Sequence, residues 1–294
     1  MHKESLCYKK LDENKVQCQT CSHYCIIENG KYGFCGVRKN IDSVLFFIFY
    51  GQVIAQNSDP IEKKPLYHYL PGTDTLTIAT VGCNFTCQWC QNWKISQITK
   101  SGERVDAIKM GFELSPERVI KDAILNHCLS ISYSYTEPTI YLEYALDTMK
   151  LAHKKGLKNI WVSNGFMSPR TVELILPYLD AINIDLKSMD NEKYVSFTGG
   201  KVDPILQNIE NIVNHKIHLE LTTLLVPGFN DKKDDLIKVA QYIVSKLGPD
   251  IPWHLSQYHP AYKMTKNPIP IELFNDIKHI GHTLGLKNIY IGNI

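Results

Sequence analysis

Residues 76–90 read LTIATVGCNFTCQWC, and this stretch decides the fold of the chain. It joins a short run rich in β-branched residues, 76–81, to three closely spaced cysteines. The run predicts a β-strand that ends at Gly82, so the cysteines should lie on the loop that directly follows it. Folds that alternate strands and helices place their cofactors at such strand ends. The stretch therefore predicts an α/β fold with a functional loop after an early strand.

The three cysteines, Cys83, Cys87 and Cys90, have the spacing C-x3-C-x2-C. Three thiolates on one short loop can hold three corners of a 4Fe–4S cluster. The fourth iron then has no cysteine ligand, and its open coordination site suits the amino and carboxylate groups of S-adenosylmethionine (SAM). An electron from the cluster would cleave SAM and release a 5′-deoxyadenosyl radical. Core thiols, or a zinc loop that lacks its fourth ligand, are the alternatives, and the strand context disfavours both.

Strand-like and helix-like runs alternate after the cysteine loop, which predicts right-handed βαβ units and a parallel sheet. About six such units are too few for a closed eight-unit barrel, so we expect an open, partial (β/α)6 barrel of the TIM type over residues 73–294. Its further strands are predicted at residues 129–134, 159–164, 181–186, 218–226 and 253–256. Its helices are predicted at residues 115–126, 138–155, 203–214, 231–246 and 271–284, with one more that begins after an N-cap at Ser168.

Residues 1–72 are predicted to form a small cysteine-rich extension. Four of its five cysteines form a set with a C-x2-C pair and a nearby histidine; they are Cys18, Cys21, Cys25 and Cys35. Such a set can close the coordination of a zinc ion or fill all four corners of a second iron–sulfur cluster, and both interpretations stay open. Four reduced thiols in a small loop are the third alternative. The apolar run 44–50 predicts one arm of a buried hairpin that turns at Gly51 and returns over residues 53–55.

The composition excludes several classes of protein. The chain has 294 residues, with 32 Lys and Arg against 30 Asp and Glu, and this net charge of +2 gives no signal of a nucleic-acid or membrane-surface partner. The first residues lack the apolar core of a signal peptide, and the run 44–50 is too short to span a bilayer. Nine cysteines at metal-ligand spacings without a secretory signal favour the cytoplasm.

The cysteine triplet, with Trp89 just before its third cysteine, resembles the signature of the radical SAM superfamily. Residues 90–92 are similar to the loop of the pyruvate formate-lyase activating enzymes. The stretch DPIEKKPLYH at residues 59–68 resembles the radical enzyme of the AmmeMemoRadiSam group, over nearly the whole chain. The resemblance implies an oxidoreductase-like enzyme with a partial barrel, a 4Fe–4S cluster and SAM. It also implies a reductant such as flavodoxin or ferredoxin, association with Memo-like and AMMECR1-like proteins, and a further segment after residue 294.

The resemblance also assigns roles at the strand ends, which meet at one mouth of a parallel barrel. Trp89 would lie beside the adenine ring. Glu137 would accept hydrogen bonds from the ammonium group of SAM, although Tyr135-Thr136 stand where two glycines usually precede this glutamate. Asp185 and Lys187 resemble a pair whose lysine neutralises the methionyl carboxylate. The other predicted cofactor-binding residues are Asn92, Asn164, Thr198 and His259.

Three functions remain in competition at this point. The first is a radical SAM enzyme that abstracts hydrogen from an unidentified substrate. The second is an activating enzyme that installs a glycyl radical on a protein partner. The third is a zinc-binding interaction module without catalysis.

Overall fold

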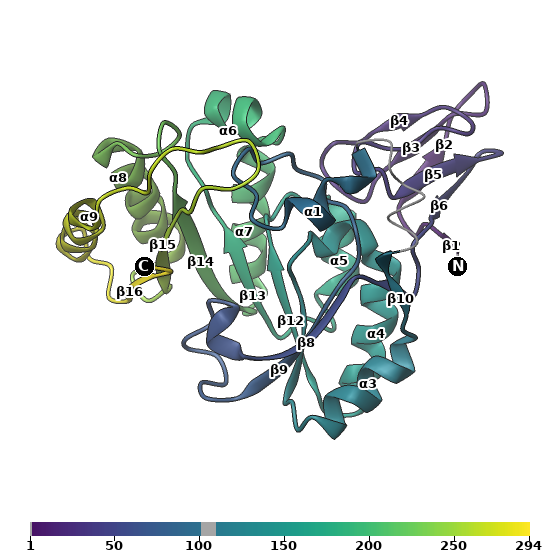
Figure 1. Cartoon of the computed structure of the whole chain (residues 1–294), viewed down its shortest axis with the longest axis horizontal. Helices are drawn as coiled ribbons and strands as arrows, with labels where there is room; N and C mark the ends of the chain where they lie inside the picture. The colour runs from purple at the N-terminus through teal and green to yellow at the C-terminus, as the bar shows by residue number, and fades with distance from the viewer. Residues whose placement is uncertain (1, 101–109) are drawn as a thin grey trace.

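The computed structural model describes residues 2–100 and 110–294. Its described part contains an eight-stranded sheet in the order β16-β15-β14-β13-β12-β11-β9-β8, which forms the centre of the molecule (Figure 1). Strand β8 (Ala55–Pro60) runs antiparallel to β9 (Asp74–Ala79). The other seven strands of this sheet, β9 and β11 to β16, pair in parallel with one another. Their bounds are β11 (Ser130–Tyr133), β12 (Lys158–Ser163), β13 (Ala181–Asp185), β14 (His218–Leu225), β15 (Trp253–Gln257) and β16 (Ile289–Gly292).

Helices cover the outer face of this curved sheet (Figure 1). Each predicted helix is present, and the predicted cap at Ser168 is confirmed because its side chain accepts a hydrogen bond from the Thr171 amide. The predicted 138–155 helix begins with a 3₁₀ turn, η3 (Pro138–Tyr141). Besides the short α1 (Trp93–Ser96) after the cysteine loop, the described α-helices are α3 (Pro116–Leu125), α4 (Leu142–Lys154), α5 (Pro169–Ile175), α6 (Asn191–Thr198), α7 (Asp203–Asn214), α8 (Lys233–Tyr242) and α9 (Ile271–Thr283). This arrangement confirms the open (β/α) barrel.

The segment between β8 and β9 closes the barrel at the amino-terminal ends of its parallel strands. Ile61 and Leu66 pack against Ile160 of β12 and Ala181 of β13 in one buried apolar cluster. The Asn183 amide, on the interior face of β13, donates to the Pro65 carbonyl at 2.8 Å. The DPIEKKPLYH stretch therefore serves as the floor beneath the barrel interior.

The buried carboxylate of Glu220 holds the carboxyl-terminal end of the DPIEKKPLYH stretch in place. Glu220 on β14 is fully buried and accepts hydrogen bonds from the backbone amides of Tyr67 (3.0 Å) and His68 (2.8 Å). His218 and His254 contact its two oxygens through Nε2 at 3.0 and 2.6 Å. Burial by itself would raise the pKa of Glu220, but these four contacts outweigh burial and lower the pKa to about 2.

The lowered pKa of Glu220 predicts a specific loss of stability in acid. The carboxylate contributes its full stabilisation above its ordinary pKa of 4.5, and the contribution is lost as the pH falls from there to about 2. A shift of this size corresponds to about 3 kcal/mol. We expect Glu220→Gln to be less stable than the unsubstituted chain at pH 7. Between pH 6 and pH 2.5, its free energy of unfolding should decrease by about 2–3 kcal/mol less than that of the unsubstituted chain. Urea unfolding at each pH measures this, and parallel pH curves would contradict it.

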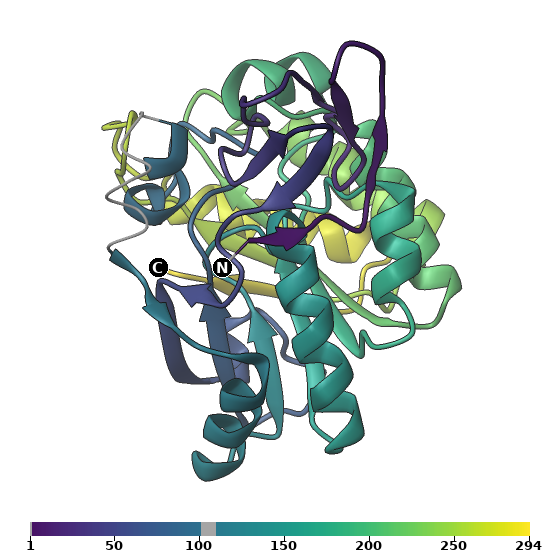
Figure 2. The ribbon, with the colours of Figure 1, turned by 90° about the vertical axis from the view of Figure 1, so that its right-hand side faces the viewer.

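The amino-terminal extension forms two small antiparallel sheets that lie beside the barrel, over the side where α4 and α5 run (Figures 1 and 2). One sheet contains β1 (Lys3–Glu4), β6 (Val44–Phe47) and β5 (Arg38–Ile41). The other contains β2 (Tyr8–Lys10), β3 (Val16–Cys18) and β4 (Ile26–Ile27). Strand β8 lies before residue 72 in the sequence but belongs to the barrel sheet. The division of the chain into two domains at residue 72 stays a prediction.

The predicted hairpin of residues 44–50 with 53–55 is wrong. Strand β6 pairs instead with the preceding β5, through a turn in which Asp42 and Ser43 have φ of 49° and 65°. Two consecutive residues with positive φ form the tight turn that matches the twist of a hairpin. After Gly51, β7 (Gln52–Val53) pairs with β10 (Phe112–Glu113), and the chain continues into the barrel sheet as β8.

A buried ion pair joins the extension to the barrel. Arg38 on β5 contacts Glu143 on α4 with 2.8 Å between Nη2 and Oε2, and each side chain is 1% exposed. The second guanidinium nitrogen donates to Glu143 Oε1 at 3.1 Å and to the Ser5 hydroxyl at 2.7 Å. The extension is therefore held by a contact that water does not screen.

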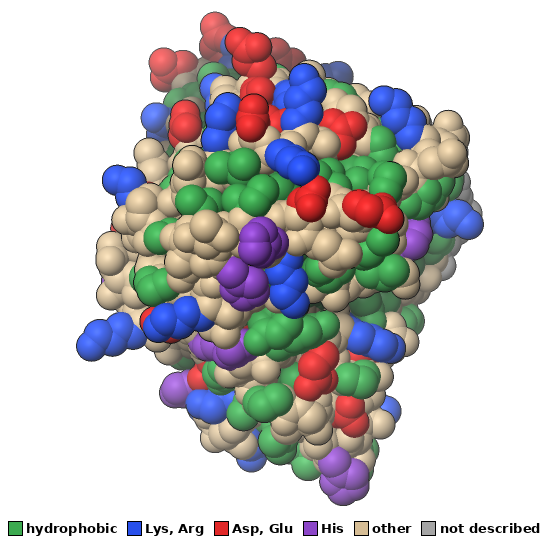
Figure 3. Space-filling view, turned by 90° about the vertical axis from the view of Figure 1, so that its left-hand side faces the viewer, with side chains coloured by type: hydrophobic (Ala, Val, Ile, Leu, Met, Phe, Trp, Pro, Cys, Tyr) green, Lys and Arg blue, Asp and Glu red, His purple; other side chains and the backbone are tan. Residues whose placement is uncertain are grey.

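The outer surface carries charges of both signs. Figure 3 shows acidic and basic side chains interspersed over one side of the molecule, with histidines gathered near its centre. In the part of the chain that the structure describes, no helix has the length and apolar character needed to cross a bilayer.

Candidate active site

The cysteine loop follows β9 at the mouth of the barrel and is held by backbone hydrogen bonds. The Thr86 amide donates to the Thr198 carbonyl at 2.7 Å, and the Gly82 amide donates to the Ile95 carbonyl at 2.9 Å. Gly82 has φ of +94°, and a Cβ there would lie 2.7 Å from Val37 Cγ1. Only glycine fits at this turn, because it needs both the positive φ and the close approach of the extension.

The three cysteines of the loop line one cavity of about 350 Å³ together with residues at the ends of the five strands β11 to β15. Burial raises the pKa of Cys83, and it raises the pKa of Cys87 to about 12. Nearby Lys100 and Lys187 offset only part of this effect. Buried thiols of this kind become thiolates when a metal supplies the compensating charge. The cavity also contains Trp89, Asn92, Glu137, Asn164, Asp185 and Lys187.

Glu137 lies at the cavity wall with most of its acceptor capacity in use. Its Oε1 accepts from the Thr139 amide (3.1 Å), the Thr139 hydroxyl (2.6 Å) and the Ser163 hydroxyl (2.8 Å), and its Oε2 accepts from the Asn164 amide (2.8 Å). Burial raises the pKa of Glu137, and these donors offset part of the increase. A carboxylate has about four lone-pair sites, two on each oxygen, so Oε2 retains capacity for another donor.

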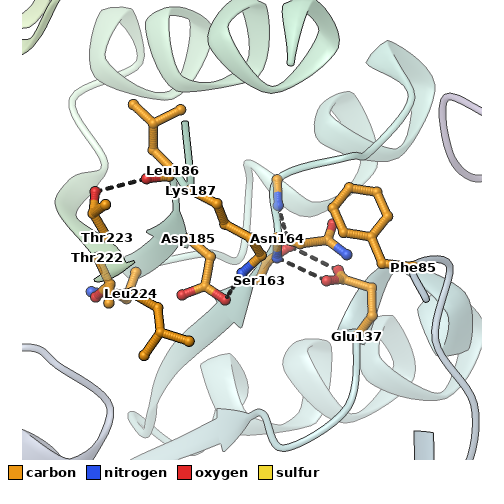
Figure 4. A network of polar contacts seen from close by, with 12 residues as sticks. Phe85, Glu137, Ser163, Asn164, Asp185, Leu186, Lys187, Thr222, Thr223 and Leu224 are labelled. Atoms are coloured by element: carbon orange, nitrogen blue, oxygen red, sulfur yellow. Dashed lines mark hydrogen bonds and ion pairs between the residues drawn. The ribbon is translucent and has the colours of Figure 1, made fainter. Parts of the chain in front are cut away.

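Asp185 and Lys187 form an ion pair at the end of β13, with 2.7 Å between Lys187 Nζ and Asp185 Oδ2. Figure 4 shows this pair beside the Glu137 network, so residues about 50 positions apart face one space. Burial alone would lower the pKa of Lys187, but Asp185 and Cys87 raise it well above the ordinary range. Lys187 is therefore a fixed positive charge next to the cysteine loop.

Tyr135 stands at one of the two positions before Glu137 where the resemblance leads one to expect glycine. Its φ is +63°, which is the left-handed conformation that glycine adopts readily. The Tyr135 hydroxyl donates to Asp59 Oδ2 at 2.6 Å, and the Lys64 ammonium lies 4.6 Å from its ring centroid. These contacts hold a strained backbone in place, a feature that is common at functional sites.

Trp89 and Asn92 lie at the edge of the cavity. Trp89 is 3% exposed and packs on Phe229, with 4.7 Å between ring centroids. Asn92 is exposed, and its amide donates to the Tyr135 carbonyl at 2.9 Å. Asn164 is committed to neighbours, because its amide nitrogen donates to Asn84 Oδ1 at 2.7 Å and its oxygen accepts from the Phe166 amide at 2.9 Å.

Two predicted cofactor-binding residues are not among the described residues that line this cavity. The Thr198 hydroxyl donates to the Tyr194 carbonyl at 2.6 Å, so only its carbonyl serves the site, by holding the cysteine loop. His259 is exposed, and its Nε2 contacts the Asn293 carbonyl at 2.8 Å. Sequence reasoning missed Asn84, whose position inside the cysteine triplet was the available signal, and Lys100, for which no local pattern exists.

A second cavity of about 580 Å³ adjoins the first. Both cavities are lined by Lys63, Lys64 and Tyr135, and the second extends to Asp59 and Tyr67. Burial opposes ionisation of Asp59, but hydrogen bonds from Lys64, Tyr135 and Thr77 outweigh it and lower its pKa to about 2. The DPIEKKPLYH stretch thus forms a wall of the space next to the cysteine loop.

The cysteines of the extension also gather in space. A small enclosed cavity is lined by Cys18, Cys21, Cys25 and Cys35. Within the described residues, no group of three or more His, Cys, Asp or Glu side chains is arranged around a single metal ion.

Comparisons with known proteins agree with this geometry. The model of the radical SAM superfamily matches residues 77–240. An uncharacterized protein of Methanocaldococcus jannaschii is 40% identical over 293 residues, which are 99% of this chain and 85% of that protein. The pyruvate formate-lyase-activating enzyme of Staphylococcus aureus is 28% identical over 175 residues, which are 56% of this chain and 67% of that enzyme.

Solved structures share the fold. A radical SAM methyltransferase from Sphaerobacter thermophilus matches with a TM-score of 0.55 and 13% identity over 76% of this chain and 67% of that chain. SuiB of Streptococcus suis bound to SAM matches with a TM-score of 0.56 and 14% identity over 74% of this chain and 51% of that chain. Assignment to the AmmeMemoRadiSam group stays a prediction. The family match over more than half of the chain, together with the cysteine loop at the barrel mouth, shows that this chain belongs to the radical SAM superfamily of enzymes.

Proposed function

We propose that this enzyme cleaves SAM reductively and uses the resulting 5′-deoxyadenosyl radical to abstract hydrogen from a substrate held at the barrel mouth. The observation that carries the proposal is the single cavity that Cys83, Cys87 and Cys90 line together with Glu137, Asp185 and Lys187. When bound, a 4Fe–4S cluster supplies the electron that breaks a sulfur–carbon bond of SAM.

The residues of the loop fit such a cluster. The Nδ2 atom of Asn84 is buried and has no hydrogen-bond partner within the described part of the chain. Its other amide atom, Oδ1, lies 3.8 Å from Cys83 Sγ. A buried N–H without an acceptor is costly, and a cluster bound by the loop would supply sulfur acceptors for it. Cys83, Cys87 and Cys90 would hold the cluster.

The residues around the cluster would orient SAM. The free acceptor capacity of Glu137 Oε2 suits the ammonium group, and the fixed charge of Lys187 suits the carboxylate. Trp89 offers a flat apolar surface for the adenine, and Asn92 lies beside it on the cysteine loop. Asn164 supports the site by holding Asn84. The remaining predicted contacts, Thr198 and His259, would act through the loop and at the far rim.

The second cavity is the proposed substrate site. It shares Lys63, Lys64 and Tyr135 with the first cavity, so a substrate there would lie next to the cysteine loop, and its volume is within the range of small-molecule sites. Association with Memo-like and AMMECR1-like proteins, and a flavodoxin or ferredoxin as reductant, are proposals that rest on the resemblance.

A second candidate is an activating enzyme that installs a glycyl radical on a protein partner. The similarity to the Staphylococcus aureus activating enzyme and the Asp185–Lys187 pair favour it. Incubation with a candidate partner, followed by electron paramagnetic resonance (EPR), separates the two functions, because only the activating enzyme produces a glycyl radical signal.

Anaerobic reconstitution with iron and sulfide tests the proposal directly. We expect the enzyme with dithionite and SAM to form 5′-deoxyadenosine and methionine in equal amounts, measured by liquid chromatography. A sample without dithionite is the control. Zinc uptake at both cysteine sets, with no iron and no deoxyadenosine, would instead support the interaction module without catalysis.

A further inference from the structure

The four cysteines of the extension surround one enclosed space. Cys18, Cys21 and Cys35 are buried and Cys25 is partly buried, and all four line the same cavity. Burial raises the pKa of Cys21, and the other three thiols raise it further. The four cysteines lie on β3, on the turns after it and on the turn before β5. The fold therefore brings together four cysteines that are spread over 18 positions of the sequence.

A second observation points to an anionic group in this space. Arg38 lines the cavity, is 1% exposed, and has a buried Nε with no hydrogen-bond partner in the described residues. Its other guanidinium nitrogens are held by Ser5 and Glu143. An unsatisfied cationic donor beside four thiols is costly by itself, and it is satisfied by a metal–thiolate group that carries net negative charge.

The spacing of the four thiols favours a cluster over a single zinc ion. Zinc holds its four sulfurs at about 2.3 Å from one point. Among the residues that the structure describes, no group of three or more His, Cys, Asp or Glu side chains is arranged around a single ion in that way. A cluster of four irons and four sulfides spreads its cysteine ligands farther apart, and four cysteines leave none of its irons open.

The cysteine set of the extension directly adjoins the catalytic loop. His23, between Cys21 and Cys25, contacts the carbonyl of Asn84 at 2.7 Å. A Cβ built on Gly82 would lie 3.2 Å from the Cys35 carbonyl. Asn84 and Gly82 flank Cys83, and on the extension side the contacts come from Cys35 itself and from His23, two residues from Cys21 and Cys25. Electron tunnelling decreases steeply with distance, so direct contact between the two cysteine-bearing segments favours transfer.

Lys100 lies between the two sets. Its ammonium interacts electrostatically with Cys35 on one side and with Cys83, Cys87 and Cys90 on the other. It donates to the Phe85 carbonyl at 2.7 Å and lies 4.4 Å from the ring centroid of Phe34. A shared positive charge stabilises the reduced, more negative form of a cluster on either side.

The surface over the extension's cysteines is apolar. Tyr24 and Ile26 flank Cys25, Phe34 precedes Cys35, and their exposed fractions are 39%, 64% and 42%. Exposed apolar side chains around a redox centre suit a short-lived encounter with an electron donor.

We propose that Cys18, Cys21, Cys25 and Cys35 hold a second, fully ligated 4Fe–4S cluster that relays electrons to the catalytic cluster. The relay rests on the proposed function, whereas the cluster itself does not. One electron from a low-potential donor of the flavodoxin or ferredoxin class reduces the second cluster from the 2+ to the 1+ state. The same electron then passes to the catalytic cluster, and the second cluster returns to 2+.

The first experiment removes the catalytic set and leaves the proposed site intact. After anaerobic reconstitution, the triple variant Cys83→Ala, Cys87→Ala, Cys90→Ala should keep about four of roughly eight irons per chain. Its EPR signal after reduction with dithionite should not change on addition of SAM. Iron loss to below one per chain, or uptake of one zinc ion in its place, would overturn the second cluster, whether or not the unsubstituted enzyme cleaves SAM.

The second experiment tests the relay with all cysteines in place. Lys100→Met should lower the reduction potentials of both clusters in an EPR-monitored titration, and Lys100→Arg, which keeps the charge, should leave both unchanged. A shift in only one cluster, or in neither, would contradict the placement of Lys100 between them.

The third experiment measures the electron path. In Cys21→Ser, Cys25→Ser, the rate at which reduced flavodoxin reduces the catalytic cluster should fall at least tenfold, measured by freeze-quench EPR. Retention of about four irons shows that this variant is folded. An unchanged rate in a folded variant would overturn the relay. If the variant does not fold, the comparison of Lys100→Met with Lys100→Arg decides instead.

Discussion

Replacing Cys87 with alanine should decrease the formation of 5′-deoxyadenosine by at least about 10³-fold, because the radical step depends entirely on a cluster that two thiols hold poorly. Cys87 is the middle cysteine of the triplet and lines the same cavity as Lys187. The loop itself should keep its position, since its backbone bonds to Thr198 and Ile95 do not involve the Cys87 side chain.

Cys128→Ala is the matched control for this substitution. Cys128 is also a buried free thiol, but its Sγ lies 3.3 Å from the Ser58 hydroxyl, beside β8 and away from the cavity. We expect this variant to retain its iron and its rate of SAM cleavage. Equal rates of deoxyadenosine formation in the Cys87 and Cys128 variants would show that the triplet is not the catalytic site.

Glu143→Gln should destabilise the protein by about 3–5 kcal/mol, because it leaves the Arg38 guanidinium buried without its counter-charge. Both side chains are 1% exposed, so water cannot replace the lost contact. The change should loosen the extension from α4 and decrease iron uptake by the extension's cysteines, of which Arg38 is a neighbour. Urea unfolding under anaerobic conditions measures the loss of stability, and iron analysis measures the loss of metal.

Glu173→Gln provides the comparison at an exposed ion pair. Glu173 lies 3.0 Å from Arg170, and these side chains are 62% and 59% exposed. Pairs of this kind contribute between about 0 and 1 kcal/mol. If the Glu143 and Glu173 variants lost equal stability, the ion pair would not be what holds the extension to the barrel.

Much of the barrel could be predicted because its elements are encoded locally. The β-branched runs, the helical periodicity and the cap at Ser168 each depend on a few neighbouring residues. The predicted 203–214 helix has the observed bounds of α7. The predicted hairpin of residues 44–50 was wrong because the pairing of strands is not encoded locally. Which strand pairs with β6 depends on the turn at Asp42 and Ser43, and the apolar run by itself carries no information about its partner.

The sequence by itself determined the α/β barrel and the cysteine triplet, because strand periodicity and ligands on one loop are both local properties. Only the tertiary structure decided which of the predicted residues line the cavity of the triplet: Glu137 and Lys187 do, and the side chains of Thr198 and His259 do not. It also placed Lys100 and the extension's cysteines against the catalytic loop. These relations join residues up to about 100 positions apart, and they arise from the pairing of distant strands, which no local pattern specifies.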